Sequence, residues 1–222
     1  MSLEIKTISL LLPFKLGRVN CYLIKTDTGY FLIDTGSSNK RTYLEKELES
    51  AGCRPGNLNL IVLTHGDFDH TGNAANLCKK FGAKIAMHYD DSGMVERGDM
   101  FWNRKKGNIF IGMIARIFSG FGKAERFKPD LYIEDAYDLS EYGLNANVLY
   151  LPGHSKGSIG ILTADGDLFC GDLLENTDEP GIGSIIDDNA AANASVEKLK
   201  SLNINTVYPG HGKPFSMSSF TK

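Results

Sequence analysis

The sequence predicts an α/β protein in which helices cover mixed β-sheets, and two observations support this class. Short apolar strands alternate with segments of helical periodicity along most of the 222-residue chain. Clusters of histidine, aspartate and glycine follow directly after several of those strands, a layout typical of folds that carry chemistry on loops. The apolar share of 42% is enough for the core of one domain, which we expect to span residues 1–222.

The chain opens with three predicted strands, at residues 5–12, 20–26 and 30–34. Thr28 and Gly29 supply turn chemistry between the second and the third, so the three strands predict a β-meander. The periodicity then changes, because Leu44 and Leu48 recur at helical spacing within residues 40–51. This segment is predicted to be a surface helix.

Alternation of strands and helices continues through the rest of the chain. Strands are predicted at residues 58–64 and 84–88, with a helix at 71–81 between them. A helix at 195–202 and a strand at 205–208 close the pattern. Such alternation favours sheets with helices on their faces.

Residues 90–139 interrupt this regularity, and we interpret them as a lid-like insertion. The segment contains Met94, Met100 and Trp102, together with further aromatic and methionine side chains up to residue 121. An apolar lid could cover a site and select an apolar acyl or ring group. The alternative is a satellite core or a homodimer contact.

The composition indicates which kind of binding partner and which cellular compartment to expect. The formal net charge of −3 provides no basic field for nucleic acid, so a small-molecule substrate is expected. No stretch approaches the roughly 20 apolar residues that a membrane span requires, and the start of the chain lacks a signal-peptide pattern. The four cysteines form no CxxC pair, which indicates a cytoplasmic protein with reduced thiols.

Histidine placement predicts a metal site. Of the five histidines, four lie in glycine-containing, loop-like segments: His65, His70, His154 and His211. Glycine allows the backbone to approach a ligand closely, and histidine and aspartate are common metal ligands. A histidine that only satisfies a buried carbonyl would not usually occur in such a series, so the set points to bound metal. For the other chemically active side chains, a structural or surface role is the simpler interpretation: His88, Lys156 and Cys170.

The order of these segments resembles the motifs of the metallo-β-lactamase superfamily along nearly the whole chain. Asp34, in the segment IDTG, is similar to the first motif, and the segment THGDFDHTG resembles the HxHxDH motif. His154, Asp172 and His211, each preceded by glycine, resemble the remaining ligands. The resemblance implies a four-layer αβ/βα sandwich of two mixed β-sheets flanked by helices, with metal ions at one edge.

The resemblance also implies roles for individual residues at a centre of two divalent ions. The first ion would be held by His65, Asp67 and His154, and the second by Asp69, His70 and His211. Asp172 would bridge both ions, and Asp34 would orient a ligand from behind. The implied enzyme is a metallo-hydrolase in which a metal-bound hydroxide attacks an ester, thioester, lactone or similar bond. Asp69 and Asp172 would be its catalytic carboxylates, with Asp69 orienting the hydroxide and passing protons.

Asp67 departs from the commonest pattern, which has histidine at this position. With Asp69, Asp172 and a hydroxide, the ligand charge becomes −4, which would neutralise two divalent ions. Oxygen-rich ligation places iron or manganese slightly ahead of zinc. Alternatively, the shorter aspartate fails to reach the first ion and leaves that site weak or empty.

Other functions remain open because the fold hosts many chemistries. A flavodiiron-like di-iron redox protein is one, since that family resembles this motif with a glutamate in place of Asp67, although electron transfer would need a separate partner. A metal-stabilised binding module is another. A hydroxyacylglutathione-hydrolase-like thioesterase is suggested by similar motifs, but only 11 residues follow His211, too few for that family's helical C-terminal domain. An RNA-processing relative would carry a large inserted domain.

Overall fold

Two β-sheets dominate the computed structural model, which describes residues 3–12, 17–104 and 125–220. The first sheet has the strand order β1-β2-β3-β4-β5-β6 and comprises β1 (Glu4–Leu11), β2 (Arg18–Thr26), β3 (Gly29–Ile33), β4 (Leu58–Val62), β5 (Lys84–Met87) and β6 (Leu131–Tyr132). The second has the order β13-β12-β9-β8-β7 and comprises β7 (Ala146–Tyr150), β8 (Ile159–Thr163), β9 (Asp167–Gly171), β12 (Thr206–Pro209) and β13 (Phe215–Ser216). A small pair, β10 (Leu174–Glu175) and β11 (Gly181–Ile182), lies beside them.

The first sheet begins as the predicted meander and continues as parallel strands. β1, β2 and β3 pair antiparallel in chain order, and β3 to β6 then pair parallel. All the predicted strands are present, with boundaries shifted by one or two residues. The prediction of mixed sheets is confirmed.

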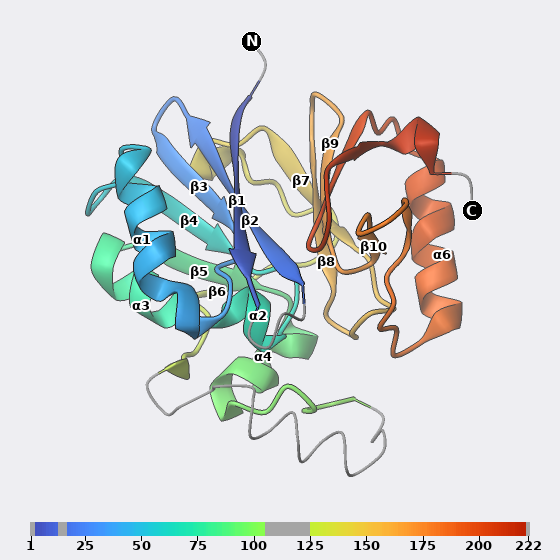
Figure 1. Cartoon of the computed structure of the whole chain (residues 1–222), viewed down its shortest axis with the longest axis horizontal. Helices are drawn as coiled ribbons and strands as arrows, with labels where there is room; N and C mark the ends of the chain where they lie inside the picture. The colour runs from blue at the N-terminus through green and yellow to red at the C-terminus, as the bar shows by residue number, and fades with distance from the viewer. Residues whose placement is uncertain (1–2, 13–16, 105–124, 221–222) are drawn as a thin grey trace.

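Helices cover the outer face of each sheet, which gives the four layers visible from left to right in Figure 1. α1 (Arg41–Ser50) and α3 (Ala74–Phe81) pack through Leu44, Leu48 and Phe81 on the first sheet. α6 (Asn189–Lys200) packs on the second. The predicted αβ/βα sandwich is therefore confirmed.

Side-chain alternation along the strands explains why the two sheets stack. In β3, Phe31 and Ile33 enter the core between the sheets, whereas Leu32 points to the helices. In β9, Phe169 enters the same central core and Leu168 faces α6. Because both faces of these strands are buried, they read in the sequence as continuous apolar runs.

Two predicted helices have different bounds from those expected. The helix expected at residues 71–81 is split into α2 (Phe68–Thr71) and α3, because the Asn73 side chain turns back and donates hydrogen bonds to the carbonyls of Thr35 and Ser37. α6 starts earlier than expected, since Asp188 caps it by accepting hydrogen bonds from two backbone N–H groups.

The expectation that residues 90–139 are irregular is wrong near both ends of that segment. Residues Tyr89–Arg97 form α4, which buries Met94 and Val95, and Leu131–Tyr132 form β6 at the edge of the first sheet. The remaining candidates for a lid, residues 105–124, lie outside the described part of the chain. No helix in the described ranges is long and apolar enough to cross a membrane.

Strand direction brings the site loops to one edge. β3 and β4 are parallel, so their carboxyl ends open at the same side of the first sheet. β9 and β12 are parallel in the second sheet, and β7 runs in the same direction because β8 is antiparallel to both β7 and β9. A hydrogen bond from Ile159 N to Thr64 O joins the two sheets at this edge.

Candidate metal centre

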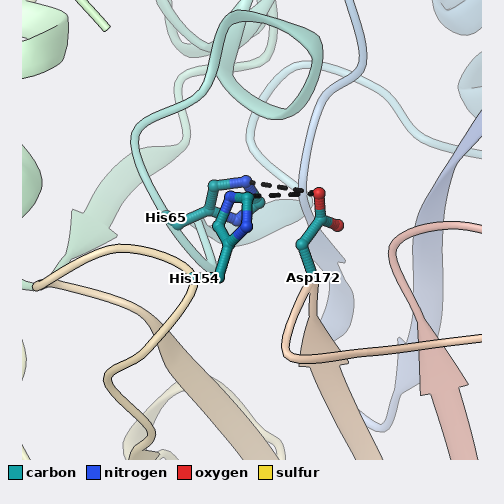
Figure 2. Close-up of side chains that lie close together, drawn as sticks. All are labelled: His65, His154 and Asp172. Carbon is teal, nitrogen blue, oxygen red and sulfur yellow. Dashed lines mark ion pairs between the residues drawn. The ribbon is translucent and has the colours of Figure 1, made fainter. Parts of the chain in front are cut away.

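The predicted ligands converge in two adjoining groups at this edge. His65, His154 and Asp172 form one group, and Asp69, His70 and His211 form the other, with the ligand atoms of each group within 4.8 Å of one another. Asp34, His65, His154, Asp172 and His211 lie on the loops after β3, β4, β7, β9 and β12, and Asp69 and His70 lie on the short helix α2 that follows β4. Figure 2 shows His65 and His154 side by side, both facing the Asp172 carboxylate. Residues spread over 177 positions of the chain, from 34 to 211, thus meet in space.

Asp172 lies between the two groups. Its Oδ2 is 3.8 Å from His65 Nε2 and 3.2 Å from His211 Nε2, and its Oδ1 is 3.3 Å from His70 Nε2. Close packing holds it there, because a Cβ on Gly210 would collide with Asp172 Oδ1. This position between both groups is consistent with the expected bridging role.

Every histidine of the centre is anchored through Nδ1. Nδ1 of His154 donates to Ile185 O and Nδ1 of His211 donates to Arg18 O, both at 2.7 Å. These carbonyl acceptors require a proton on Nδ1, so the Nε2 atom of each ring points into the centre and is the nitrogen available to an ion. A hydrogen bond behind the ring that fixes the inward nitrogen is typical of metal-binding histidines.

Asp34 anchors the other two imidazoles. Its Oδ2 accepts from His70 Nδ1 at 2.8 Å and from the Thr64 hydroxyl at 2.8 Å. The Thr64 oxygen in turn lies 3.0 Å from His65 Nδ1 and accepts a hydrogen bond from it. Asp34 has a φ of 59°, a strained conformation for a residue with a side chain, and the Thr64 N–H bond to Oδ1 helps to hold it.

Buried atoms without hydrogen-bond partners test whether these residues fit a metal ion. Nε2 of His65, Nε2 of His70 and Oδ1 of Asp172 are buried and have no hydrogen-bond partner. Unpaired buried polar atoms cost free energy, and native proteins rarely leave several together. These atoms belong to the two ligand groups, and imidazole nitrogen and carboxylate oxygen are common metal ligands, so the donor set suits divalent metal.

The electrostatics lead to the same conclusion. Burial lowers the pKa of His211, but the Asp172 carboxylate outweighs it and raises that pKa to about 11. His70 behaves alike: burial lowers its pKa, while Asp172, Asp34 and Asp69 together hold it well above the ordinary value. The clustered carboxylates therefore favour positive charge at this position, which protons or metal ions can supply.

Asp67 is placed differently from the other predicted ligands. Its Oδ2 lies 3.1 Å from His154 Nε2 and 3.7 Å from His65 Nε2, while its Oδ1 forms an ion pair of 2.8 Å with Arg104 Nη1. Burial raises the pKa of Asp67, but Arg104 and His154 reverse this and keep the pKa far below its usual range. The carboxylate is thus ionised and already paired with a cation.

Asp91 is a site residue that sequence reasoning missed. It is fully buried on α4, where its carboxylate accepts hydrogen bonds from Gly66 N, Ser155 Oγ and Gly157 N at 2.6–2.9 Å. It therefore joins the loop of His65 to the loop of His154. Arg104 and Asp187 were also missed. Their only sequence signal is charge within irregular segments, which does not distinguish them from ordinary surface residues.

A cleft of about 360 Å³ opens onto the centre and mixes apolar walls with the ligands. Leu12, Phe68, Met100 and Ile185 line it beside Asp69. These apolar side chains lie next to the ligand groups, so a substrate would place an apolar part beside the reacting bond.

Trp102 does not line this cleft, which contradicts the lid interpretation for that residue. Its indole stacks over the Arg97 guanidinium, 3.7 Å from the ring centroid, against α4. His88 caps α4 and stacks on Tyr150, and Cys170 is buried with its pKa raised by burial to about 12, so both have the expected structural roles. Lys156 contacts Asn103 at the surface, away from the cleft lining.

Comparison with known proteins supports the resemblance. The chain is 27% identical to a beta-lactamase-like protein 2 homolog of Caenorhabditis elegans, covering 90% of this chain and 58% of that protein. It is 27% identical to the hydroxyacylglutathione hydrolase GloC of Haemophilus influenzae, covering 74% and 70% of the two chains. The crystal structure of TTHA1623 in a di-iron-bound form has a TM-score of 0.73 and 28% identity, covering 96% of this chain and 95% of that one.

The family profile covers nearly the whole chain. Residues 15–211 match the metallo-beta-lactamase superfamily, a span that contains every ligand of both groups. The layers, the motif order and the convergence of the histidines all agree with that match. The chain belongs to the metallo-beta-lactamase superfamily.

Proposed function

We propose that this protein is a metal-dependent hydrolase of thioester or ester bonds in small molecules. The observation that carries the proposal is the set of four imidazoles anchored through Nδ1, whose Nε2 atoms face three carboxylates beside an open cleft. The match to a hydroxyacylglutathione hydrolase, whose name denotes cleavage of a thioester, supports this bond class. The match covers only 58% of the nematode relative, so we infer the activity from the site and not from that relative.

The metal-holding residues follow from the two groups. His65, His154 and Asp172 would hold one divalent ion and Asp69, His70 and His211 the other, with Asp172 shared between them. Such ions lower the pKa of a water molecule toward neutrality and polarise a carbonyl oxygen. We propose iron or manganese slightly ahead of zinc, supported by the di-iron form of a similar structure.

The chain's own groups supply the remaining steps. Asp69 borders the cleft with its carboxylate 3.5 Å from His211 Nε2, a place from which it can accept a proton from the attacking water and return it to the leaving group. Phe68, Met100 and Ile185 form the apolar wall that would hold an acyl chain and exclude water. We also propose that the protein acts in the cytoplasm as one domain, with a homodimer as the candidate assembly.

A panel of substrates tests the proposal. Protein loaded with Zn²⁺, Mn²⁺ or Fe²⁺ should hydrolyse acyl thioesters or esters of increasing chain length, and chelation should remove the activity. Lactones, a β-lactam and a phosphodiester serve as comparison substrates. Full activity in the chelated protein, or hydrolysis of the phosphodiester alone, would rule the proposal out.

The di-iron redox alternative is less well supported by the structure. The carboxylate at position 67 was the feature that suggested it, and that carboxylate forms an ion pair with Arg104. Oxygen or nitric oxide consumption by the iron form with an external electron donor, in the absence of hydrolysis, would favour that alternative.

A further inference from the structure

Arg104 places a buried positive charge at one of the two ligand groups. Its Nη1 lies 2.8 Å from Asp67 Oδ1, and its Nη2 lies 3.4 Å from His154 Nε2. Only 6% of its side chain is exposed. The guanidinium thus contacts two residues, Asp67 and His154, that the resemblance assigned to the first ion.

The arginine is held in this position from a second side. Arg104 Nε lies 2.8 Å from Asp187 Oδ2, and Asp187 N donates to Gly153 O, immediately before His154. Arg104 therefore bridges the Asp67 loop and the loop that carries His154. Burial lowers the pKa of Arg104, but Asp67 and Asp187 outweigh it, so the guanidinium stays charged.

Within the described residues, no arginine or lysine forms an ion pair with the other ligand group. The ion-pair contacts of Asp69 and Asp172 that the structure describes are all with histidines. A histidine can release its proton when an ion binds, whereas an arginine retains its charge at any physiological pH. An ion beside Asp67 therefore has to bind next to a permanent positive charge, whereas the described ion-pair partners of Asp69 are imidazoles.

We propose that Arg104 makes the metal centre load unequally, so that the group of Asp69, His70 and His211 binds the first ion tightly and the group beside Asp67 binds a second ion weakly. This inference rests on the metal centre of the proposed function. It assigns Arg104 as a positioning residue that engages Asp67 in place of the metal. The physical cause is repulsion between like charges where burial leaves little screening by water.

Titration of metal-free protein with Co²⁺ tests the inference without measuring activity. Calorimetry and the visible absorption of bound Co²⁺ report each binding step, and elemental analysis after dialysis reports the ions retained per chain. The wild type should retain one ion. Arg104→Gln should lower the dissociation constant of the second step by at least about tenfold, because it removes the charge. Arg104→Met is a second uncharged variant, useful if the first folds poorly.

Two controls separate charge at the site from general effects. Arg97→Gln removes an exposed positive charge from α4 that stacks on Trp102, and should leave both steps unchanged. Arg104→Lys keeps the charge and should keep the second step weak. Circular dichroism verifies that each variant is folded.

The outcomes are distinct. Two metal-binding steps of equal affinity in the wild type would overturn the inference but not the proposed function. The same holds if the affinity of the second step is unchanged in both Arg104→Gln and Arg104→Met. A wild type that binds no ion would overturn the inference and the proposed function together. One tight metal-binding step in the wild type, and two tight steps only in the uncharged Arg104 variants, would establish the inference.

Discussion

The two halves of the centre are built alike but carry different charges. In both halves, hydrogen bonds to Nδ1 turn each imidazole inward, to a carbonyl at His154 and His211 and through Asp34 at His70 and His65. Asp69 meets only histidines among its described ion-pair contacts, whereas Asp67 meets the guanidinium of Arg104. Ligand type and spacing therefore do not make two sites equivalent, because a residue outside the motif can set the charge of one.

The largest effect on metal binding and turnover is expected when the half that contains Asp69, His70 and His211 loses one of its predicted ligands. His70→Ala removes an imidazole that contacts both Asp34 and Asp172, so metal retention should fall and turnover should drop by about 1000-fold or more. Elemental analysis and steady-state kinetics measure the two quantities. His88→Ala is the matched control, since His88 stacks on Tyr150 away from the centre. Turnover close to that of the control would show that His70 is not a ligand.

Asp34→Asn should weaken metal binding by about 10- to 100-fold, the usual cost of removing a hydrogen-bond partner behind a metal-bound histidine. The reason is that the amide no longer offers two charged oxygens to His70 and Thr64. Competition with a coloured chelator measures the affinity, and Asp135→Asn, an exposed carboxylate paired with Lys198, is the control. Equal affinities in the two variants would remove Asp34 from the description of the centre.

Asp91→Asn should destabilise the half of the centre that contains His154, because Asp91 joins the loop of His65 to the loop of His154. The amide leaves one of three buried donors without an acceptor, so the free energy of unfolding should fall by about 2–3 kcal/mol. Urea denaturation of metal-free protein measures it, with the neighbouring and partly exposed Asp90→Asn as control. A loss no larger than that of the control would mean that these hydrogen bonds are weak.

The smallest effect concerns the cleft. Met100→Ala should raise the KM of the best acyl substrate by up to about tenfold with metal content unchanged, because Met100 lines the cleft. Trp102→Ala should leave KM nearly unchanged, since Trp102 packs on Arg97 instead. Kinetics of the two variants on one substrate decide the matter, and a larger change for Trp102 would restore the lid interpretation for that residue.

Much of the molecule could be predicted because its signals are local. Strand patterns, the helix at Leu44 and Leu48, and the histidines beside glycine depend on neighbours in the chain, and the structure places each as expected. Helix α4 was not predicted, because its apolar residues were interpreted as part of an irregular insertion. Asp91 and Arg104 could not be assigned, since the partners of their side chains lie 25 or more positions away in the sequence. Asp187, for example, is 83 positions from Arg104.

The sequence by itself determined the family, the sandwich and the side chains of the two candidate ligand groups, because motif order fixes which residues follow which strand ends. Only the tertiary structure decided the state of Asp67. From the sequence, its carboxylate either completed a pair of ions or fell short of one. In the fold, it lies within ion-pair distance of Arg104, 37 positions further along the chain. Charge pairing depends on distance in space and on burial, and a linear motif contains neither.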